Sequence, residues 1–217
     1  MRNNLCIYCG KNPADTRDHV PPKSFFPRPR PANLITVPSC EDCNNIFGKD
    51  DERARNIITS IHTTEVHPAI SQQIADKRER SFKRTEGVSN FLHLLSSIKL
   101  TEHPSDTGDH FYRALAFNLD QKIFDRFIER MTRALLFYEN EIEWTELDIK
   151  WKLSPNIQEI PSETQKFLLN GQVKEIGDGV FSYIGYFLQG TVTSLWFMNF
   201  YDGLEIMSLV RAVKEID

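Results

Sequence analysis

The stretch CIYCGKNPADTRDHVPPKSFFP, residues 6–27, and the later stretch CEDCNN, residues 40–45, decide the fold of the first part of the chain. Each begins with two cysteines separated by two residues, and the chain has no cysteine besides Cys6, Cys9, Cys40 and Cys43. One such turn presents two thiolates, and a tetrahedral zinc site needs four sulfurs about 2.3 Å from the metal. Disulfides are the alternative, but they are rare in reducing compartments. The spacing therefore predicts a structural zinc site.

Composition and length indicate an ordinary folded protein. The chain has 217 residues, of which 40% are hydrophobic and 26% are charged, so it can bury a sizeable core as one large domain or as a small module joined to a larger one. No apolar run reaches the roughly 18 residues that a membrane span needs. The first residues lack the apolar stretch of a signal peptide. We therefore expect a cytoplasmic protein with no membrane partner.

The charge is distributed unevenly along the chain. Residues 1–56 carry nine Lys and Arg against seven Asp and Glu, and residues 57–138 carry eleven against ten. Residues 139–217 carry six against thirteen, a net charge of −7. Because phosphates repel acidic surfaces, a nucleic-acid surface would lie in the first part of the chain. The alternative is that the acidity of the last third only keeps that part in solution.

Residues 1–56 are predicted to form a first unit. A short strand over residues 5–8 would enter the first cysteine pair, and five prolines make residues 21–31 an extended loop. A second strand over NLITVPSC, residues 33–40, would lead to the second pair. A helix would follow, since acidic residues lie early in it and Arg53 and Arg55 lie later, as the helix dipole favours. The prediction is a ββα module held by one zinc ion.

The rest of the chain is predicted to be a helical connector, residues 57–100, and an α+β domain, residues 101–217. The polar segment 101–110 is expected to be a loop, and FYRALAFNL, residues 111–119, a strand. Residues 120–139 carry apolar residues at helical spacing. The β-rich segments beyond predict a mostly antiparallel sheet, with a type I′ turn at Asp202-Gly203. The whole chain is therefore predicted to be α+β.

Asp18 and His19 are not needed by a zinc site. Zinc would hold the intervening loop against the start of the following helix, so both residues are expected to face Asn44 and Asn45. Carboxylate and amide oxygens are hard ligands that suit Mg²⁺, and a histidine can accept a proton from water near neutral pH. These groups and a cationic loop are what phosphodiester hydrolysis requires. Each also has a structural alternative: Asp18 in a turn, Asn44 as a helix cap and His19 hydrogen-bonded within the loop.

The motifs carry a resemblance to a known family. C-x-x-C, Asp-His-Val-x-Pro, Asn-Leu-Ile and C-x-x-C-Asn-Asn together resemble the HNH (ββα-metal) endonucleases, over about residues 5–56. The pattern is most similar to members with an HNN variant of the motif and a structural four-cysteine zinc. An asparagine directly after the last zinc cysteine is similar to the arrangement of phage endonuclease VII. The resemblance implies a bacterial or phage setting, such as defence against invading DNA or mobile-element biology.

The resemblance also implies a role for each site residue. His19 would be the general base, and Asp18 and Asn44 would bind a catalytic Mg²⁺ or Mn²⁺ ion, with Asn45 as the competing ligand. Asn33 would orient the catalytic histidine. The reaction would leave 5′-phosphate and 3′-hydroxyl ends. Since the family's last histidine is replaced by asparagine here, a hard ion is favoured over a catalytic zinc.

DNA is the expected partner, and the motif does not distinguish it from RNA because it acts on the backbone. The candidate nucleic-acid contacts are cations of the loop and of the helix, which could equally be solvated surface residues: Arg17, Lys23, Arg28, Arg30, Lys49 and Arg53. Residues 87–217 are expected to bind a target, a protein partner or a second copy of the chain. The alternative function is a non-catalytic zinc-knuckle module that binds nucleic acid or protein.

Overall fold

The computed structural model describes residues 4–96, 98–105, 108–116, 120–140, 146–153, 171–188 and 190–213, with residues 142, 160, 162, 165 and 166. The fold is α+β, as predicted, and its sheets are antiparallel. The elements are, in order, β1 (Thr16–Val20), η1 (Lys23–Phe25), β2 (Ile35–Ser39), α1 (Glu41–Ile58), α2 (His62–Glu65), η2 (Ile70–Ile74), α3 (Ala75–Phe82), α4 (Thr85–Ser96), β3 (Lys99–Pro104), β4 (Phe111–Ala116), α5 (Gln121–Asn140), β5 (Leu147–Leu153), β6 (Lys174–Ile176), β7 (Phe181–Phe187), β8 (Ser194–Phe200) and β9 (Leu204–Ala212).

The first part of the chain contains two antiparallel strands followed by a helix. β1 pairs with β2, with Asp18 opposite Val37 and His19 opposite Thr36. Alternate residues of β2 are buried, as expected for a strand with one face on a core. α1 starts immediately after Cys40, with Glu41 and Asp42 in its first turn, where the helix dipole favours acidic side chains. This order places β1, β2 and α1 next to one another.

The first strand does not lie where the sequence predicted it. Residues 5–8 contribute only an isolated bridge between Leu5 and Pro13, and the strand is Thr16–Val20. The reason is that the backbone near the first cysteine pair closes a tight turn, in which the Gly10 N–H donates to the Cys6 carbonyl at 2.8 Å. Asp18 and His19 consequently lie on a strand and not in a loop.

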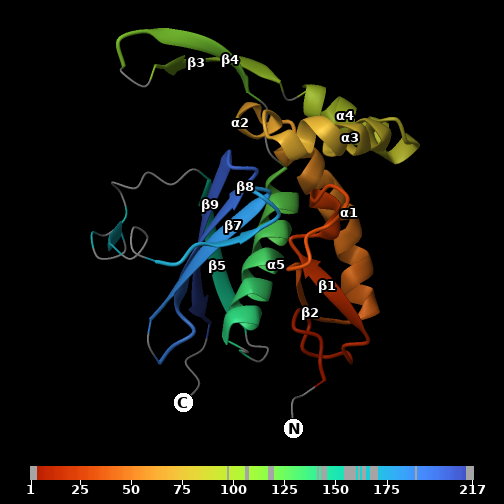
Figure 1. Ribbon diagram of the computed structural model, residues 1–217, viewed down its shortest axis with the longest axis vertical. Coiled ribbons are helices and arrows are strands. Elements are labelled where there is room, and N and C mark those ends of the chain that lie inside the picture. The colour runs from red at the N-terminus through yellow and green to blue at the C-terminus, as the bar shows by residue number, and fades with distance from the viewer. Residues whose placement is uncertain are drawn as a thin grey trace.

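The connector is helical, as predicted, through α2, η2, α3 and α4. The predicted loop over residues 101–110 is wrong in its first part, because β3 continues to Pro104 and pairs with β4 as a hairpin. The hairpin extends away from the rest of the molecule (Figure 1) and exposes Leu100 and Phe111. The predicted strand 111–119 is observed over Phe111–Ala116, and residues 117–119 lie outside the described residues.

The C-terminal part is a five-stranded sheet packed on α5. The strand order is β5-β9-β8-β7-β6, and every pair is antiparallel. The turn between β8 and β9 lies one residue earlier than predicted: Tyr201 and Asp202 are its central residues, each with the positive φ of a type I′ turn, and the Gly203 N–H donates to the Phe200 carbonyl. No helix among the described residues is both long and apolar enough to cross a membrane.

α5 lies between the large sheet and the β1, β2 and α1 unit, and contacts both (Figure 1). Its apolar stripe, predicted from spacing, is buried. The ring of Phe25 lies 5.7 Å from that of Phe127 in α5 and 5.7 Å from that of Phe200 in β8. The Tyr201 hydroxyl donates to the Phe25 carbonyl at 2.7 Å. The described residues thus share one continuous core that extends across residues 56 and 100. The domain boundaries predicted at these residues stay predictions.

Candidate metal centre and active site

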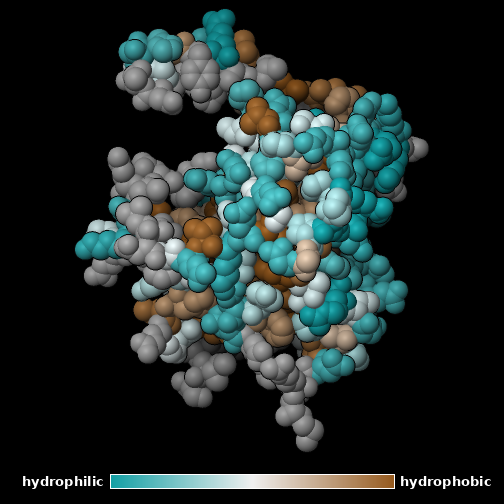
Figure 2. Space-filling view, viewed as in Figure 1, coloured by the Kyte–Doolittle hydropathy of each residue, from teal (hydrophilic) through white to brown (hydrophobic). Residues whose placement is uncertain are grey.

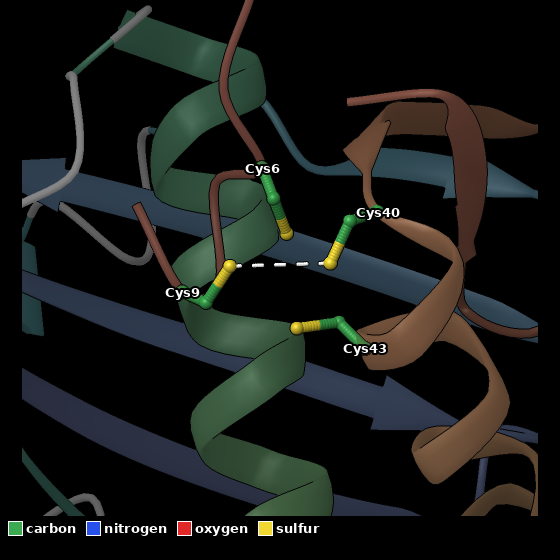
Figure 3. A group of neighbouring side chains, drawn as sticks. All are labelled: Cys6, Cys9, Cys40 and Cys43. Atoms are coloured by element: carbon green, nitrogen blue, oxygen red, sulfur yellow. Dashed lines mark hydrogen bonds between the residues drawn. The ribbon is translucent and has the colours of Figure 1, made fainter. Parts of the chain in front are cut away.

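The four cysteines meet beside the start of α1 (Figure 3). Cys6 and Cys9 come from the N-terminal turn, whereas Cys40 precedes α1 and Cys43 lies in its first turn. All four sulfurs lie within 4.8 Å of one another, and the Sγ atoms of Cys9 and Cys40 are 3.9 Å apart. Sulfurs around a tetrahedral zinc ion would be about 3.8 Å apart. The cluster can therefore hold a metal ion, and its geometry is consistent with a structural zinc.

The turn that carries Cys6 and Cys9 is shaped by its own backbone. Gly10 has a φ of 62°, a conformation that glycine adopts without strain, and the Cys6 N–H donates to the Asn12 carbonyl at 2.9 Å. Burial raises the pKa of the Cys9 thiol, but hydrogen bonds from the backbone of Asn12 and Lys11 and from the side chains of Cys6 and Cys40 together lower that pKa to about 7. Cys9 is thereby close to its metal-binding thiolate form at neutral pH.

Asp18 lies in a buried ionic cluster. Its side chain is only 5% exposed, and its Oδ2 accepts a 2.6 Å hydrogen bond from the Tyr8 hydroxyl. The same oxygen lies 3.4 Å from Nη1 of Arg130, which reaches it from α5. The Arg130 guanidinium also forms a two-bonded ion pair with Asp51 in α1. Of the two Asp18 oxygens, Oδ1 is the one that these contacts leave for a metal ion.

Arg130 is a residue that the sequence reasoning missed. It is 4% exposed and its guanidinium lies 4.7 Å from the centre of the Phe47 ring. Burial would lower its pKa, but the carboxylates of Asp51 and Asp18 raise it above the usual value for arginine. Its position in the apolar stripe of α5, between buried Phe127 and Met131, was the available signal, because a charge there needs a buried partner.

The cluster of Asp18, Asp51 and Arg130 has more negative than positive charge. Two carboxylates share one guanidinium, which gives a net charge of −1 when all three are ionised. Burial raises the pKa of Asp51 to about 6, although Arg130 opposes this change. Because of this surplus negative charge, binding of an additional cation next to the cluster is electrostatically favoured.

His19 occupies the opposite face of β1 and has a different environment. Adjacent residues of a strand point to opposite sides, and His19 is half-buried, next to the proline-rich loop. Its pKa is lowered by burial and then by Lys23, while Asp18 opposes the change and Arg30 and Arg17 add to it. The imidazole is therefore uncharged at neutral pH and able to accept a proton.

The structure separates the two candidate asparagines. The Asn44 Nδ2 donates to the Thr16 hydroxyl at 3.3 Å, so Asn44 faces the side of β1 that also carries Asp18. Asn45 is exposed. The helix cap is Cys40, so the alternative of Asn44 as the cap is wrong. Because Asn44 donates through its nitrogen, its Oδ1 is the atom that remains for a metal ion.

Asn33 bonds to the C-terminal sheet. Its side-chain amide donates to the Glu175 carbonyl in β6 at 3.1 Å, which joins the loop to the C-terminal sheet. The predicted role in orienting His19 stays a prediction. The loop is also held from the connector: the side-chain amide of Gln73 exchanges two 2.7 Å hydrogen bonds with the backbone of Arg28, and the Lys77 Nζ donates to the Phe26 carbonyl.

The residues predicted to contact nucleic acid differ in whether their side chains already make hydrogen bonds within the protein. The Arg17 guanidinium donates to the hydroxyl and the carbonyl of Thr36 across the strand pair, and the Arg30 Nε donates to the Lys23 carbonyl at 3.3 Å. Arg53 is half-buried on α1. Five of the six side chains are exposed, including the two arginines with these hydrogen bonds: Arg17, Lys23, Arg28, Arg30 and Lys49.

Comparison of the chain with models of protein families, with curated proteins and with solved structures gave no match. The resemblance to HNH endonucleases consequently rests on the motif residues themselves.

Proposed function

We propose that this protein is a metal-dependent endonuclease of the HNH type that hydrolyses phosphodiester bonds of DNA. One observation carries the proposal: His19, a histidine held uncharged beside cations, directly follows Asp18 on β1, and the Asp18 side of that strand faces Asn44. A general base must be unprotonated at working pH, and cations beside it favour a phosphate substrate. In this proposal the four cysteines bind zinc, which holds β2 and α1 in position and takes no part in the reaction.

Asp18 and Asn44 are the residues that would hold the catalytic Mg²⁺ or Mn²⁺ ion. Their free Oδ1 atoms are hard donors, and the net charge of −1 at Asp18, Asp51 and Arg130 favours a cation there. When bound, such an ion stabilises negative charge on the phosphate and on the leaving 3′ oxygen. Asn44 is preferred over Asn45 because Asn44 contacts Thr16 of β1, whereas Asn45 is exposed.

The protein's own residues would perform the proton transfer and bind the substrate. His19 would take a proton from the attacking water, and the cations that lower its pKa, Lys23 and Arg30, would hold the phosphate near it. Attack by water with departure of the 3′ oxygen leaves a 5′-phosphate and a 3′-hydroxyl. The hydrogen bonds from Gln73 and Lys77 keep the loop fixed, which preserves this arrangement.

A non-catalytic zinc-knuckle module is the second candidate, and one observation favours it. The Asp18 carboxylate already binds Tyr8 and Arg130, so it has a structural role without any metal ion. A module of that kind would bind nucleic acid or protein through the same loop and helix.

Cleavage of supercoiled plasmid separates the two candidates. Wild type is compared with His19→Ala, with added Mg²⁺, with added Mn²⁺ and with no added divalent ion, and zinc content is measured for each sample. The proposal predicts nicking that requires the added ion and that falls by about 10²–10⁴ in the variant. His62→Ala is the matched control, since His62 is exposed on α2 and its loss should leave nicking unchanged. Equal nicking by wild type and His19→Ala, or none by either, would reject the proposal.

A further inference from the structure

A positively charged pocket of about 360 Å³ lies between α1, η1 and α3, beyond the residues of the proposed active site. Hydrophilic side chains cover the surface over α1 and α3 (Figure 2). The pocket is lined by four cations, one acid and one helical glycine, among others: Arg55, Lys77, Arg80, Arg84, Glu52 and Gly48. These charges sum to +3, although the whole chain has a net charge of −4. The pocket therefore concentrates a positive potential in an acidic protein.

Arg55 lines this pocket with a hydrogen-bond donor that is not used. The residue is buried, and its Nε has no hydrogen-bond partner among the described residues. Its Nη2 donates to Asn56 at 2.8 Å and lies 3.9 Å from Glu52. A buried donor without an acceptor is destabilising. Most buried donors in native proteins are paired, so an acceptor that entered this pocket would satisfy the Arg55 Nε.

The other cations of the pocket are also incompletely compensated. Burial lowers the pKa of Lys77, and Arg55, Arg30, Arg28 and Arg80 lower it further, which shows the repulsion among these like charges. Glu52 lies 3.3 Å from Arg84, its closest partner. Arg80 makes no hydrogen bond or ion pair with the described part of the chain. An anion bound in the pocket would relieve this repulsion.

Gly48 keeps one wall of the pocket open. It lies in the interior of α1, where glycine is less favourable than alanine. A Cβ added at this position would have no atom within 4 Å among the described residues, so no packing contact requires glycine. A missing side chain on an open helix face permits the close approach of a ligand.

The pocket and the proposed metal ligand lie on one face of α1. Gly48 is one turn beyond Asn44, and Arg55 is eleven residues beyond it, which is about 16 Å along the axis at 1.5 Å per residue. Phosphates of one strand of a nucleic acid are about 3.4 Å apart along the helix axis. A strand that runs along α1 from Asn44 would therefore bring a phosphate to this pocket within a few nucleotides.

We propose that this pocket binds a backbone phosphate of the nucleic-acid strand, a few nucleotides from the bond that is cut. This inference rests on the proposed function for its choice of ligand. A free nucleotide offers the same phosphate oxygens, but the shared face of α1 favours a continuous strand. The guanidinium groups of Arg55, Arg80 and Arg84 would donate to the phosphate oxygens, and Lys77 would contribute its charge.

Binding in the absence of cleavage tests the proposal. Full-length protein that carries His19→Ala is titrated onto fluorescein-labelled DNA, as a 20-nucleotide strand and as a 20-base-pair duplex, with no added divalent ion. Fluorescence anisotropy gives Kd from 50 to 200 mM KCl. We expect Arg80→Ala to weaken binding several-fold and to reduce the slope of log K against log salt by about 0.7–0.9, the contribution of one phosphate contact. Gly48→Leu should weaken binding while the charge is unchanged.

A control variant and a competing ligand separate the possible outcomes. Lys122→Ala removes an exposed cation on α5 and should bind DNA as the parent protein does. Wild-type affinity and salt slope in both Arg80→Ala and Gly48→Leu would overturn the proposal. Tighter binding of labelled AMP than of DNA, weakened by Arg80→Ala, would assign the pocket to a free nucleotide and also overturn it. DNA binding that depends on Arg80, in a protein that does not nick plasmid, would keep the pocket and reject the nuclease.

Discussion

The two faces of β1 provide opposite environments for two consecutive residues. Asp18 faces inward, where Tyr8 and Arg130 bind a carboxylate that is almost fully buried. His19 faces the loop, half-buried and surrounded by the positive charges of Lys23 and Arg30. One face therefore has an excess of negative charge and the other an excess of positive charge, separated by the thickness of a single strand.

In the proposed function, this difference would divide the work of a hydrolytic site between the two faces of β1. A negative face favours a cation, and a positive face favours a phosphate, while the histidine between the cations stays uncharged. The two faces also differ in how much they contribute to the stability of the fold. The inward face connects β1 to α1 and α5 through Arg130, whereas the outward face contributes little to the core.

Removal of the cysteine cluster should affect both faces and produce the largest effect. Cys40→Ser combined with Cys43→Ser removes both sulfurs that α1 contributes, so the N-terminal turn is no longer held against the helix. We expect loss of the bound zinc, about one ion per chain in the wild type, and loss of cooperative unfolding. Metal analysis and thermal melting followed by circular dichroism measure these changes.

Asn12→Ala is the matched control for the cysteine variant, because Asn12 donates to the Cys40 sulfur at 3.7 Å and is not a ligand. It should retain its zinc. A double cysteine variant that melts at the wild-type temperature would contradict a structural metal site.

Arg130→Met should disrupt the inward face alone. It leaves Asp18 and Asp51 buried without a counter-charge, so we expect a loss of about 3–5 kcal/mol in the free energy of unfolding, measured by urea titration. Arg126→Met, one turn earlier on α5, is the control: Arg126 pairs with Asp50 but is half exposed, so its loss should be smaller. Equal losses in the two variants would mean that burial of the ion pair is not decisive.

The protonation of His19 tests the proposed environment of the outward face. Its pKa is lowered, so the imidazole loses its proton below pH 6.5 as the pH rises. Plasmid nicking should therefore fall as pH decreases through that pKa, because a protonated base cannot accept a proton, and should be constant at neutral pH. Lys23→Ala should raise the pKa of His19, which NMR titration of the imidazole measures without cleavage. A pKa of 6.5 or more in the wild type would contradict the cationic environment.

Arg17→Ala should give the smallest effect. Arg17 lies on the outward face and bonds Thr36 across the strand pair, where it is exposed to solvent. Exposed polar pairs contribute about 0.2–1 kcal/mol, so the unfolding free energy should fall by no more than that. A loss as large as that of Arg130→Met would show that the outward face also has a structural role.

Short-range patterns allowed much of the fold to be predicted. The spacing of apolar residues placed α5, and alternation with turn residues placed β7, β8 and β9. The first strand was misplaced because the turn at Cys6 uses backbone groups that a strand would need. Of the hairpin β3–β4, strand β4 was predicted, whereas β3 was missed because its polar residues and its proline are typical of a loop.

The candidate site could be predicted only in part. The residues near the cysteines were found because a metal site imposes local spacing, and Asn44 was favoured over Asn45 from that spacing. Arg130 was not found, because its pairing with Asp18 joins residues on β1 and α5 that are distant in the sequence. Nor did the sequence reveal the pocket of Arg55 and Lys77, which forms where α3 packs beside α1.

By itself the sequence determined the four-cysteine cluster, the amphipathic α5 and the placement of an Asp-His pair between the two cysteine turns, because each depends on the spacing of nearby residues. The tertiary structure alone decided that Asp18 pairs with Arg130 of α5, that His19 lies near the cations Lys23 and Arg30 and that a positive pocket lies farther along α1. Burial and charge depend on which distant segments pack together, and no local pattern specifies that.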